Sequence, residues 1–196
     1  MINQVYKISV APSVEPMSLA DAKTHLRVDA SDDDDYITAL IKAVRLHAER
    51  ITGRGFITQT WEMRRDTFPA SNSIKLRYAP LQSITSLIYK DSDGTDNTWA
   101  SSNYVVDTYR EPGLIILEDG VSWPSDTLYE TGGVRVLYVL GYGDAASDLD
   151  EDLIHVMKLH LTVLFECRAP ISEIKLQPVP LGYHALLEQF RIHESW

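Results

Sequence analysis

Four consecutive aspartates, Asp32 to Asp35, are the first residues whose type and spacing suggest chemistry. A calcium-binding loop needs alternating oxygen ligands, a central glycine and a later glutamate, whereas these acids are consecutive with no glycine among them. Carboxylates at a helix start are instead favoured by the helix dipole, each by about 0.3–1 kcal/mol. We therefore predict a helix start here rather than a metal site, and the acidic segment 148–152 repeats the pattern.

The six histidines and the single cysteine do not form a catalytic or metal-binding pattern. His155 and His160 are five residues apart, so they do not share a helix face as an i, i+4 zinc pair would. Cys167 lies two helical turns from His160, which is too far for a thiol–imidazole pair. We expect Cys167 to be a buried structural residue, and we expect the protein to bind no metal and no cofactor.

Common motifs for nucleophilic catalysis and phosphate binding are missing, since no serine lies in a G-x-S-x-G elbow and there is no P-loop. The segments GRGF (53–56) and GYGD (141–144) are interpreted as the ends of a helix and a strand. The tryptophans are not interleaved with basic residues as in a platform for single-stranded nucleic acid. We expect packing or interface roles for Trp61, Trp99, Trp123 and Trp196. The sequence therefore predicts a protein that is not an enzyme.

The chain of 196 residues carries a net charge of −10. This acidic balance argues against a protein that grips DNA by its phosphates, and it suits a surface past which DNA moves without sticking. One cysteine fits a reducing compartment. No apolar run reaches the roughly 20 residues of a membrane span, and the N-terminus does not resemble a secretory signal, so we expect a cytoplasmic protein without membrane contact.

The N-terminal part of the chain predicts two helices, the first over residues 18–27 and the second over 33–53. Gly53 stands where a left-handed residue ends a helix. The second helix has a main apolar stripe for the core, formed by Ile37, Leu40, Ile41, Val44, Ala48 and Ile51. It also has a weaker stripe that needs a second partner, within the subunit or across a subunit interface: Ala39, Ala43 and Leu46.

The segment 56–143 is rich in β-branched and aromatic residues and is divided by glycine and proline turns. This pattern predicts five or six antiparallel strands that form a small sheet or sandwich. The predicted strands lie within residues 58–68, 73–78, 83–90, 103–107, 113–118 and 133–142.

Two further helices are predicted after the strands. The first begins near 147–150 and ends near Arg168, and it is apolar around most of its circumference. A proline-containing connector, 169–180, leads to a short final helix with Tyr183, Leu186, Leu187 and Phe190 on one stripe. The predicted fold is α+β: a single domain over 1–196, with a helical bundle from residues 15–55 and 147–196 and the β-rich insertion 56–143 between them.

The order of these parts resembles the head–tail connector, or adaptor, proteins of tailed bacteriophages and gene transfer agents. The resemblance covers nearly the whole chain, and its N-terminal half is the more specific. The residues that carry it there are Pro16, Leu19, Ala22, Lys23, Leu26, Arg27, Ala48, Glu49, Thr52, Gly53, Arg54, Gln59, Thr60 and Trp61. The C-terminal residues that carry it are Tyr138 to Gly143, Leu153 to Phe165, Leu186, Leu187, Phe190 and Arg191.

The resemblance implies a structural role without catalytic residues. Such adaptors form a ring, usually twelvefold, below the capsid portal, and they connect the portal to a tail or stopper protein. DNA passes through the shared channel without specific binding. The resemblance also implies assembly in the host cytoplasm and a final place in the particle neck, either of a phage or of a gene transfer agent. The alternative from another class is a small enzyme or ligand-binding domain that uses the β insertion as a pocket wall.

The final helix is too short to be stable alone, because helices below about 12–15 residues are marginal in water. It must therefore dock on another surface, either the subunit's own helices or the portal. In similar adaptors the C-terminal region helps to dock the ring, which favours the portal. The expected anchors are Phe190, Arg191 and Trp196, because aromatic residues and arginine carry much interface energy.

Overall fold

The computed structural model describes residues 4–167 and 181–192. Contacts within the chain divide it into two compact units. The β unit comprises Met1–Pro12 and Thr58–Gly141, and the helical unit comprises Ser13–Ile57 and Tyr142–Trp196. The predicted connector 169–180 lies outside the described residues, as does Trp196.

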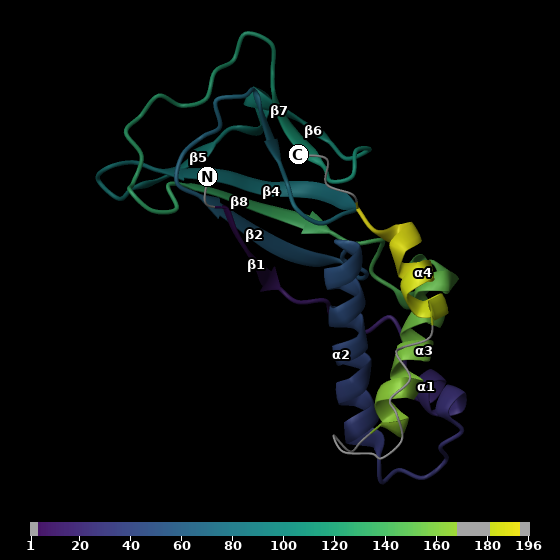
Figure 1. Ribbon diagram of the computed structural model, residues 1–196. Helices are drawn as coiled ribbons and strands as arrows, with labels where there is room; N and C mark the ends of the chain where they lie inside the picture. The colour runs from purple at the N-terminus through teal and green to yellow at the C-terminus, as the bar shows by residue number, and fades with distance from the viewer. Residues whose placement is uncertain (1–3, 168–180, 193–196) are drawn as a thin grey trace. The chain divides into compact units, whose positions relative to one another are not determined.

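The helical unit contains the four helices that the sequence predicts (Figure 1): α1 (Leu19–Leu26), α2 (Asp34–Thr52), α3 (Glu151–Glu166) and α4 (Leu181–Phe190), with a short 3-10 turn η2 (Ala146–Asp148). The Ser18 hydroxyl caps α1 by accepting a hydrogen bond from the Asp21 N–H. The aspartate run lies at the start of α2, as predicted. The Asp33 side chain makes no capping bond, and Asp34 forms an ion pair with Lys23 Nζ. Gly53 ends α2 with φ of 71°, a left-handed conformation that glycine adopts without strain.

One hydrophobic core holds the helical unit together, and all four helices contribute to it. The predicted main stripe of α2 is confirmed, because its residues are buried in this core or packed against it. α4 inserts Tyr183 and Leu187, which are 1% and 0% exposed. The buried members are Met17, Ala22, Ile37, Ile41, Val44, Ala48, Phe56, Leu149, Leu153, Val156, Met157, Leu161, Tyr183 and Leu187.

The prediction that Cys167 is buried is wrong, because the residue is exposed. The helical pattern of α3 ends at Glu166, and Cys167 follows as the residue that caps its C-terminus. Because Cys167 lies beyond the last helical residue, its side chain does not point to the buried face of α3, and the apolar periodicity of the helix does not predict its burial.

The β unit contains two antiparallel sheets. The larger has the strand order β1-β2-β8-β4-β5 and the smaller the order β3-β7-β6. A 3-10 turn, η1 (Ser101–Asn103), precedes β6. The strand bounds are β1 (Gln4–Val10), β2 (Gln59–Arg65), β3 (Ser73–Lys75), β4 (Leu81–Lys90), β5 (Asp96–Trp99), β6 (Tyr104–Asp107), β7 (Leu114–Leu117) and β8 (Val134–Leu140).

The six predicted strands are present, and two further strands, β1 and β5, occupy the edges of the larger sheet. β1 alternates apolar and polar residues from Tyr6 to Val10, but it is exposed along nearly its whole length and was not among the predicted strands. β5 has only four residues, three of them polar. Because β1 comes from the N-terminus and pairs with β2, the sheet is not confined to the segment 56–143.

Residues of both sheets form a single core in the β unit. The central strand β8 alternates buried and half-buried residues, as expected for a strand with one face in a core. A group of aromatic rings closes one part of this core, with Phe68 stacked on Trp123 at 5.0 Å and Trp99 at 5.1 Å from Trp123. The α+β class of the prediction is thus confirmed, with two antiparallel sheets.

Candidate assembly surfaces

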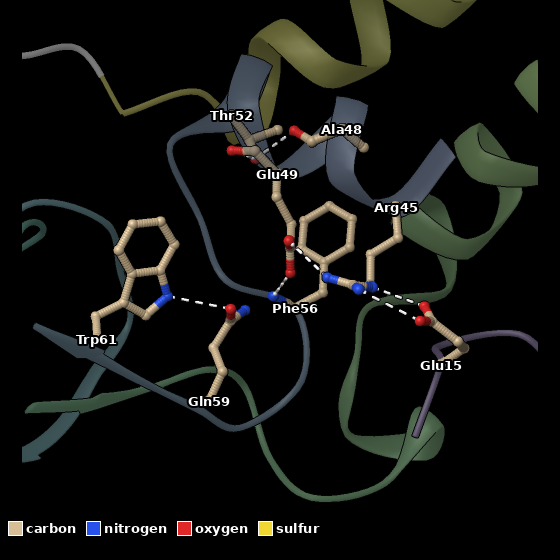
Figure 2. Close-up of polar contacts among 8 residues, drawn as sticks. All are labelled: Glu15, Arg45, Ala48, Glu49, Thr52, Phe56, Gln59 and Trp61. Carbon is tan, nitrogen blue, oxygen red and sulfur yellow. Dashed lines mark hydrogen bonds and ion pairs between the residues drawn. The ribbon is translucent and has the colours of Figure 1, made fainter. Parts of the chain in front are cut away.

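A buried ion network at the C-terminal half of α2 organises the helical unit (Figure 2). Arg45 and Glu49 are only 2% and 4% exposed. The Arg45 Nε donates to Glu15 Oε2 at 2.6 Å, and its Nη1 donates to Glu49 Oε2 at 2.8 Å. The other Glu49 oxygen accepts the Phe56 backbone N–H at 2.9 Å. The network therefore ties the segment before α1 and the turn after α2 to the same face of one helix.

Burial and neighbouring charges shift the pKa of Arg45 in opposite directions. Burial alone lowers the pKa of Arg45, but the hydrogen bond with Glu15 and the charges of Glu49 and Glu15 outweigh it and raise the pKa above its ordinary value. Arg45 therefore stays charged, and a buried charge must keep its partners. Arg45 and Glu15 were not predicted as functional residues from the sequence. Arg45 could have been found from its i, i+4 spacing to Glu49 on the apolar face of the helix.

The turn after α2 is held by the residues that carry the connector resemblance. The Thr52 hydroxyl donates to the Ala48 carbonyl at 2.8 Å, and the Gly53 N–H donates to the Glu49 carbonyl at 2.9 Å. Arg54 Nε donates to the carbonyl of Phe190, which connects α4 to this turn. In the β unit, Trp61 Nε1 donates to Gln59 Oε1 at 3.1 Å (Figure 2). These residues have structural roles and do not gather into a catalytic site.

The second apolar stripe of α2 lies away from the core of the helical unit. Ala39 and Ala43 are exposed, and Leu46 is half-buried. Small side chains on an exposed helix face allow close approach by another backbone, so this stripe is a candidate contact surface. The structure thus brings the three predicted interface residues onto one side of α2.

The predicted C-terminal anchors are in different environments. Phe190 is half-buried and packs against the core of the helical unit. Arg191 is exposed and lies 3.4 Å from Glu188 Oε2 in a surface ion pair. Trp196 is outside the described residues. Of the two anchors that the structure describes, Arg191 has the exposed side chain.

Three histidines gather where α4 packs on α2 and α3. The rings of His47 and His160 are 4.8 Å apart, and Tyr183 of α4 lies 5.0 Å from His160. The Tyr183 hydroxyl is 3.3 Å from His160 Nδ1. His184 adjoins Tyr183, with their ring centres 5.1 Å apart. In residues 4–167 and 181–192, no three or more His, Cys, Asp or Glu side chains are placed to hold a metal ion.

Comparison with known proteins decides the family. Residues 16–112, about half of the chain, match the family model described as "Phage gp6-like head-tail connector protein". The chain belongs to this family. The connector's match begins at Pro16 and therefore includes α1, α2 and the ion pair of Arg45 with Glu49, whereas Glu15 lies just before it. Among curated proteins, none matches the sequence significantly.

Solved structures with the same fold come from gene transfer agent particles. A chain of the "Neck of empty GTA particle computed with C6 symmetry" matches with a TM-score of 0.82 and 19% identity, over 98% of the connector and 97% of that chain. A chain of the "Virion of native gene transfer agent (GTA) particle" matches with a TM-score of 0.80 and 21% identity, over 98% of the connector and 97% of that chain. A chain of the "Neck of native GTA particle computed with C12 symmetry" matches with a TM-score of 0.71 and 23% identity, over 100% of the connector and 97% of that chain.

Family membership identifies the protein as a head–tail connector, a structural component rather than an enzyme. The alternative of a small enzyme with a pocket on the β unit is therefore set aside. In the described part of the connector, no helix is both long enough and apolar enough to cross a membrane.

The histidine group predicts a pH-dependent stability of the connector. Burial, together with the charges that His47 and His184 would carry, lowers the pKa of His160 to about 4. The pKa of His47 is also lowered, by burial and by the charges of His184 and Arg50. Since an unfolded histidine has a pKa of about 6.5, the unfolded state binds the proton first. The stability gained by keeping His160 neutral is complete above about pH 6.5 and is lost as the pH falls towards 4.

We expect the free energy of unfolding of the wild type to fall by about 2 kcal/mol more between pH 7 and pH 5 than that of a His160→Gln variant. Glutamine keeps an acceptor for the Tyr183 hydroxyl but does not titrate. Urea unfolding of both proteins at the two pH values measures the difference. Parallel changes in the two proteins would contradict a neutral, buried His160.

Proposed function

We propose that the connector assembles as a ring in the neck of a gene transfer agent particle or a tailed phage, between the portal and the next tail or stopper protein. The observation that supports this most strongly is the fold match over 98–100% of the chain to chains of gene transfer agent particles, two of them from neck reconstructions with C6 and C12 symmetry. DNA passes through the channel of such a ring. The net charge of −10 keeps DNA from binding to its wall, because like charges repel.

The subunit interface of the proposed ring includes Ala39, Ala43 and Leu46. Two of these residues are exposed in the single chain, and the third is half-buried. A cyclic ring needs two different, complementary patches on each subunit. The exposed stripe of α2 supplies one of them, and the four helices act in the ring as a single bundle that holds this stripe in place.

Portal docking is assigned to the C-terminal segment, with Phe190, Arg191 and Trp196 as anchors. The exposed guanidinium of Arg191 supports this role. Assembly takes place in the host cytoplasm, and the portal templates a ring of subunits that can be monomeric when alone. The connector then remains in the neck of the particle.

Changing Ala43 to glutamate tests the ring. The variant places a charge in the proposed interface, and we expect a folded subunit that no longer forms rings on the portal. Electron microscopy of the connector co-expressed with its portal measures ring formation. Ala20→Glu is a matched control, because Ala20 is also exposed on a helix but lies on α1. Normal rings with Ala43→Glu would exclude this face of α2 from the interface.

A further inference from the structure

A small hollow on the outer face of the five-stranded sheet gathers positive charge on a chain that is acidic as a whole. Its volume is about 150 Å³. Its cations come from three neighbouring strands, and the loop before β8 forms one side. The lining residues are Arg64, Ile88, Lys90, Asp96, Tyr129, Thr131, Gly132, Gly133 and Arg135.

The two arginines of the hollow are directly opposite each other, Arg64 on β2 and Arg135 on β8. Like charges in this position destabilise a pair of strands unless an anion compensates them. Within the subunit, Glu62 pairs with Arg64. Asp96 accepts a bond from Arg135 Nη2 at 2.7 Å and also lies 3.8 Å from Lys90 Nζ. Two carboxylates are thus shared among three cations.

One donor in the hollow has no acceptor among the described residues. Arg135 Nε is buried and makes no hydrogen bond, although the neighbouring Nη2 of the same guanidinium does. A carboxylate commonly binds a guanidinium through two parallel bonds, and here Asp96 makes only one. A second carboxylate in the hollow would add a partner for the Arg135 guanidinium, and it would bond Nε only after the side chain shifted, because this atom is buried.

Tyr129 and Thr131 line the loop side of the hollow, and the two glycines that follow them add no side chains there. A Cβ atom at Gly133 would lie 2.8 Å from the Tyr129 carbonyl oxygen and 2.9 Å from that of Asp66, so no larger residue fits without a shift of backbone. Gly132 has φ of 65°, which also favours glycine. The Gly132 N–H is already used by Asp66, so anion binding depends on the side-chain cations.

The size of the hollow limits its ligand to a single anionic group. Pockets for small molecules typically have about 300–1,000 Å³, so a nucleotide does not fit. DNA binding requires many phosphate contacts along a basic track, and three cations in one hollow do not form such a track. A carboxylate of a protein partner matches both the size and the charge.

We propose that the hollow binds a carboxylate of the acidic run Asp32–Asp35 from a second copy of the connector. Asp34 is bound to Lys23 of its own chain, whereas Asp32 and Asp35 are exposed and make no ion pair with other described residues. Most of the excess negative charge lies on the helical unit, and the cationic hollow lies on the β unit. A head-to-tail ring contact joins two different patches of the same chain, so these two can meet. The inference rests on the proposed ring.

The test uses the full connector labelled with ¹⁵N and a peptide of residues 29–37, compared with the same peptide in which Asp32–Asp35 are asparagine. We expect the acidic peptide alone to shift the NMR signals of the Gly133 amide and the Arg135 Nε–H, and added salt to weaken the shift. Arg64→Gln and Lys90→Gln should each weaken binding at least about fivefold. Arg110→Gln is the matched control, because Arg110 is an exposed arginine of the β unit outside the hollow.

Three results would overturn the inference: no shift at millimolar peptide, equal binding of the asparagine peptide, or equal binding of inorganic phosphate or a single-stranded DNA oligonucleotide. Ring assembly on the portal provides the separate readout. If Arg64→Gln subunits form rings as readily as the wild type, the proposed carboxylate contact between subunits is excluded, but the proposed ring is not. If the wild type forms no ring while the peptide binds, the proposed ring is excluded, and the hollow is still a carboxylate-binding site.

Discussion

Replacing Glu49 with alanine is expected to destabilise the helical unit of the connector by about 3–5 kcal/mol, since it leaves a buried charge without its partner. Arg45 would lose the acceptor of its Nη1, and the Phe56 N–H would lose the Glu49 oxygen that accepts its hydrogen bond. Both groups are buried, so water cannot replace the carboxylate without opening the structure. Urea unfolding monitored by circular dichroism at pH 7 measures the loss.

Two comparison variants show whether the network or the side-chain volume is responsible. Glu188→Ala removes an exposed glutamate from α4 and should change stability by less than about 0.5 kcal/mol. The double variant Arg45→Met with Glu49→Leu removes both charges and should recover much of the loss, because no buried charge then remains unpaired. A Glu49→Ala connector as stable as the wild type would show that the network does not hold the turn after α2.

Truncation after Pro180 is expected to cost more than about 4 kcal/mol, because it removes two fully buried side chains from the core. Tyr183 and Leu187 are part of that core, and the Ile192 N–H donates to the Thr52 carbonyl at 2.8 Å. The truncated connector should therefore have a much lower Tm or be insoluble. A soluble protein with a near-native Tm would mean that α4 does not dock on its own subunit.

This truncation cannot separate portal contact from folding, so the portal role needs a variant that leaves the core intact. Arg191→Glu reverses an exposed charge, and its effect on Tm should be small. If the C-terminal segment docks on the portal through Arg191, the variant should bind the portal at least about tenfold more weakly. Unchanged binding would exclude Arg191 as an anchor.

The helices could be predicted from the sequence because their signals are local. The 3, 4, 3, 4 spacing of apolar residues in α2 lies within one helix, and Gly53 marks its end by a property of its own backbone. The aspartates at the start of α2 act through the dipole of the same helix. The turn after α2 carried enough residue-specific information to indicate the connector family, because Glu49, Thr52 and Gly53 all contribute to its hydrogen bonding.

Only the tertiary structure decided the features that depend on distant segments. Arg45 binds Glu15 from 30 residues away, and no local pattern indicates that pair. The position of strand β1 at the edge of the sheet depends on its pairing with β2, in which Gln4 lies opposite Arg65 and Val10 opposite Thr60. The cationic hollow joins β2, β4, β5 and β8, whose order in the sheet differs from their order in the chain. Helix periodicity is set by neighbours within a few residues, whereas strand pairing and buried charge depend on which distant segments the fold brings together.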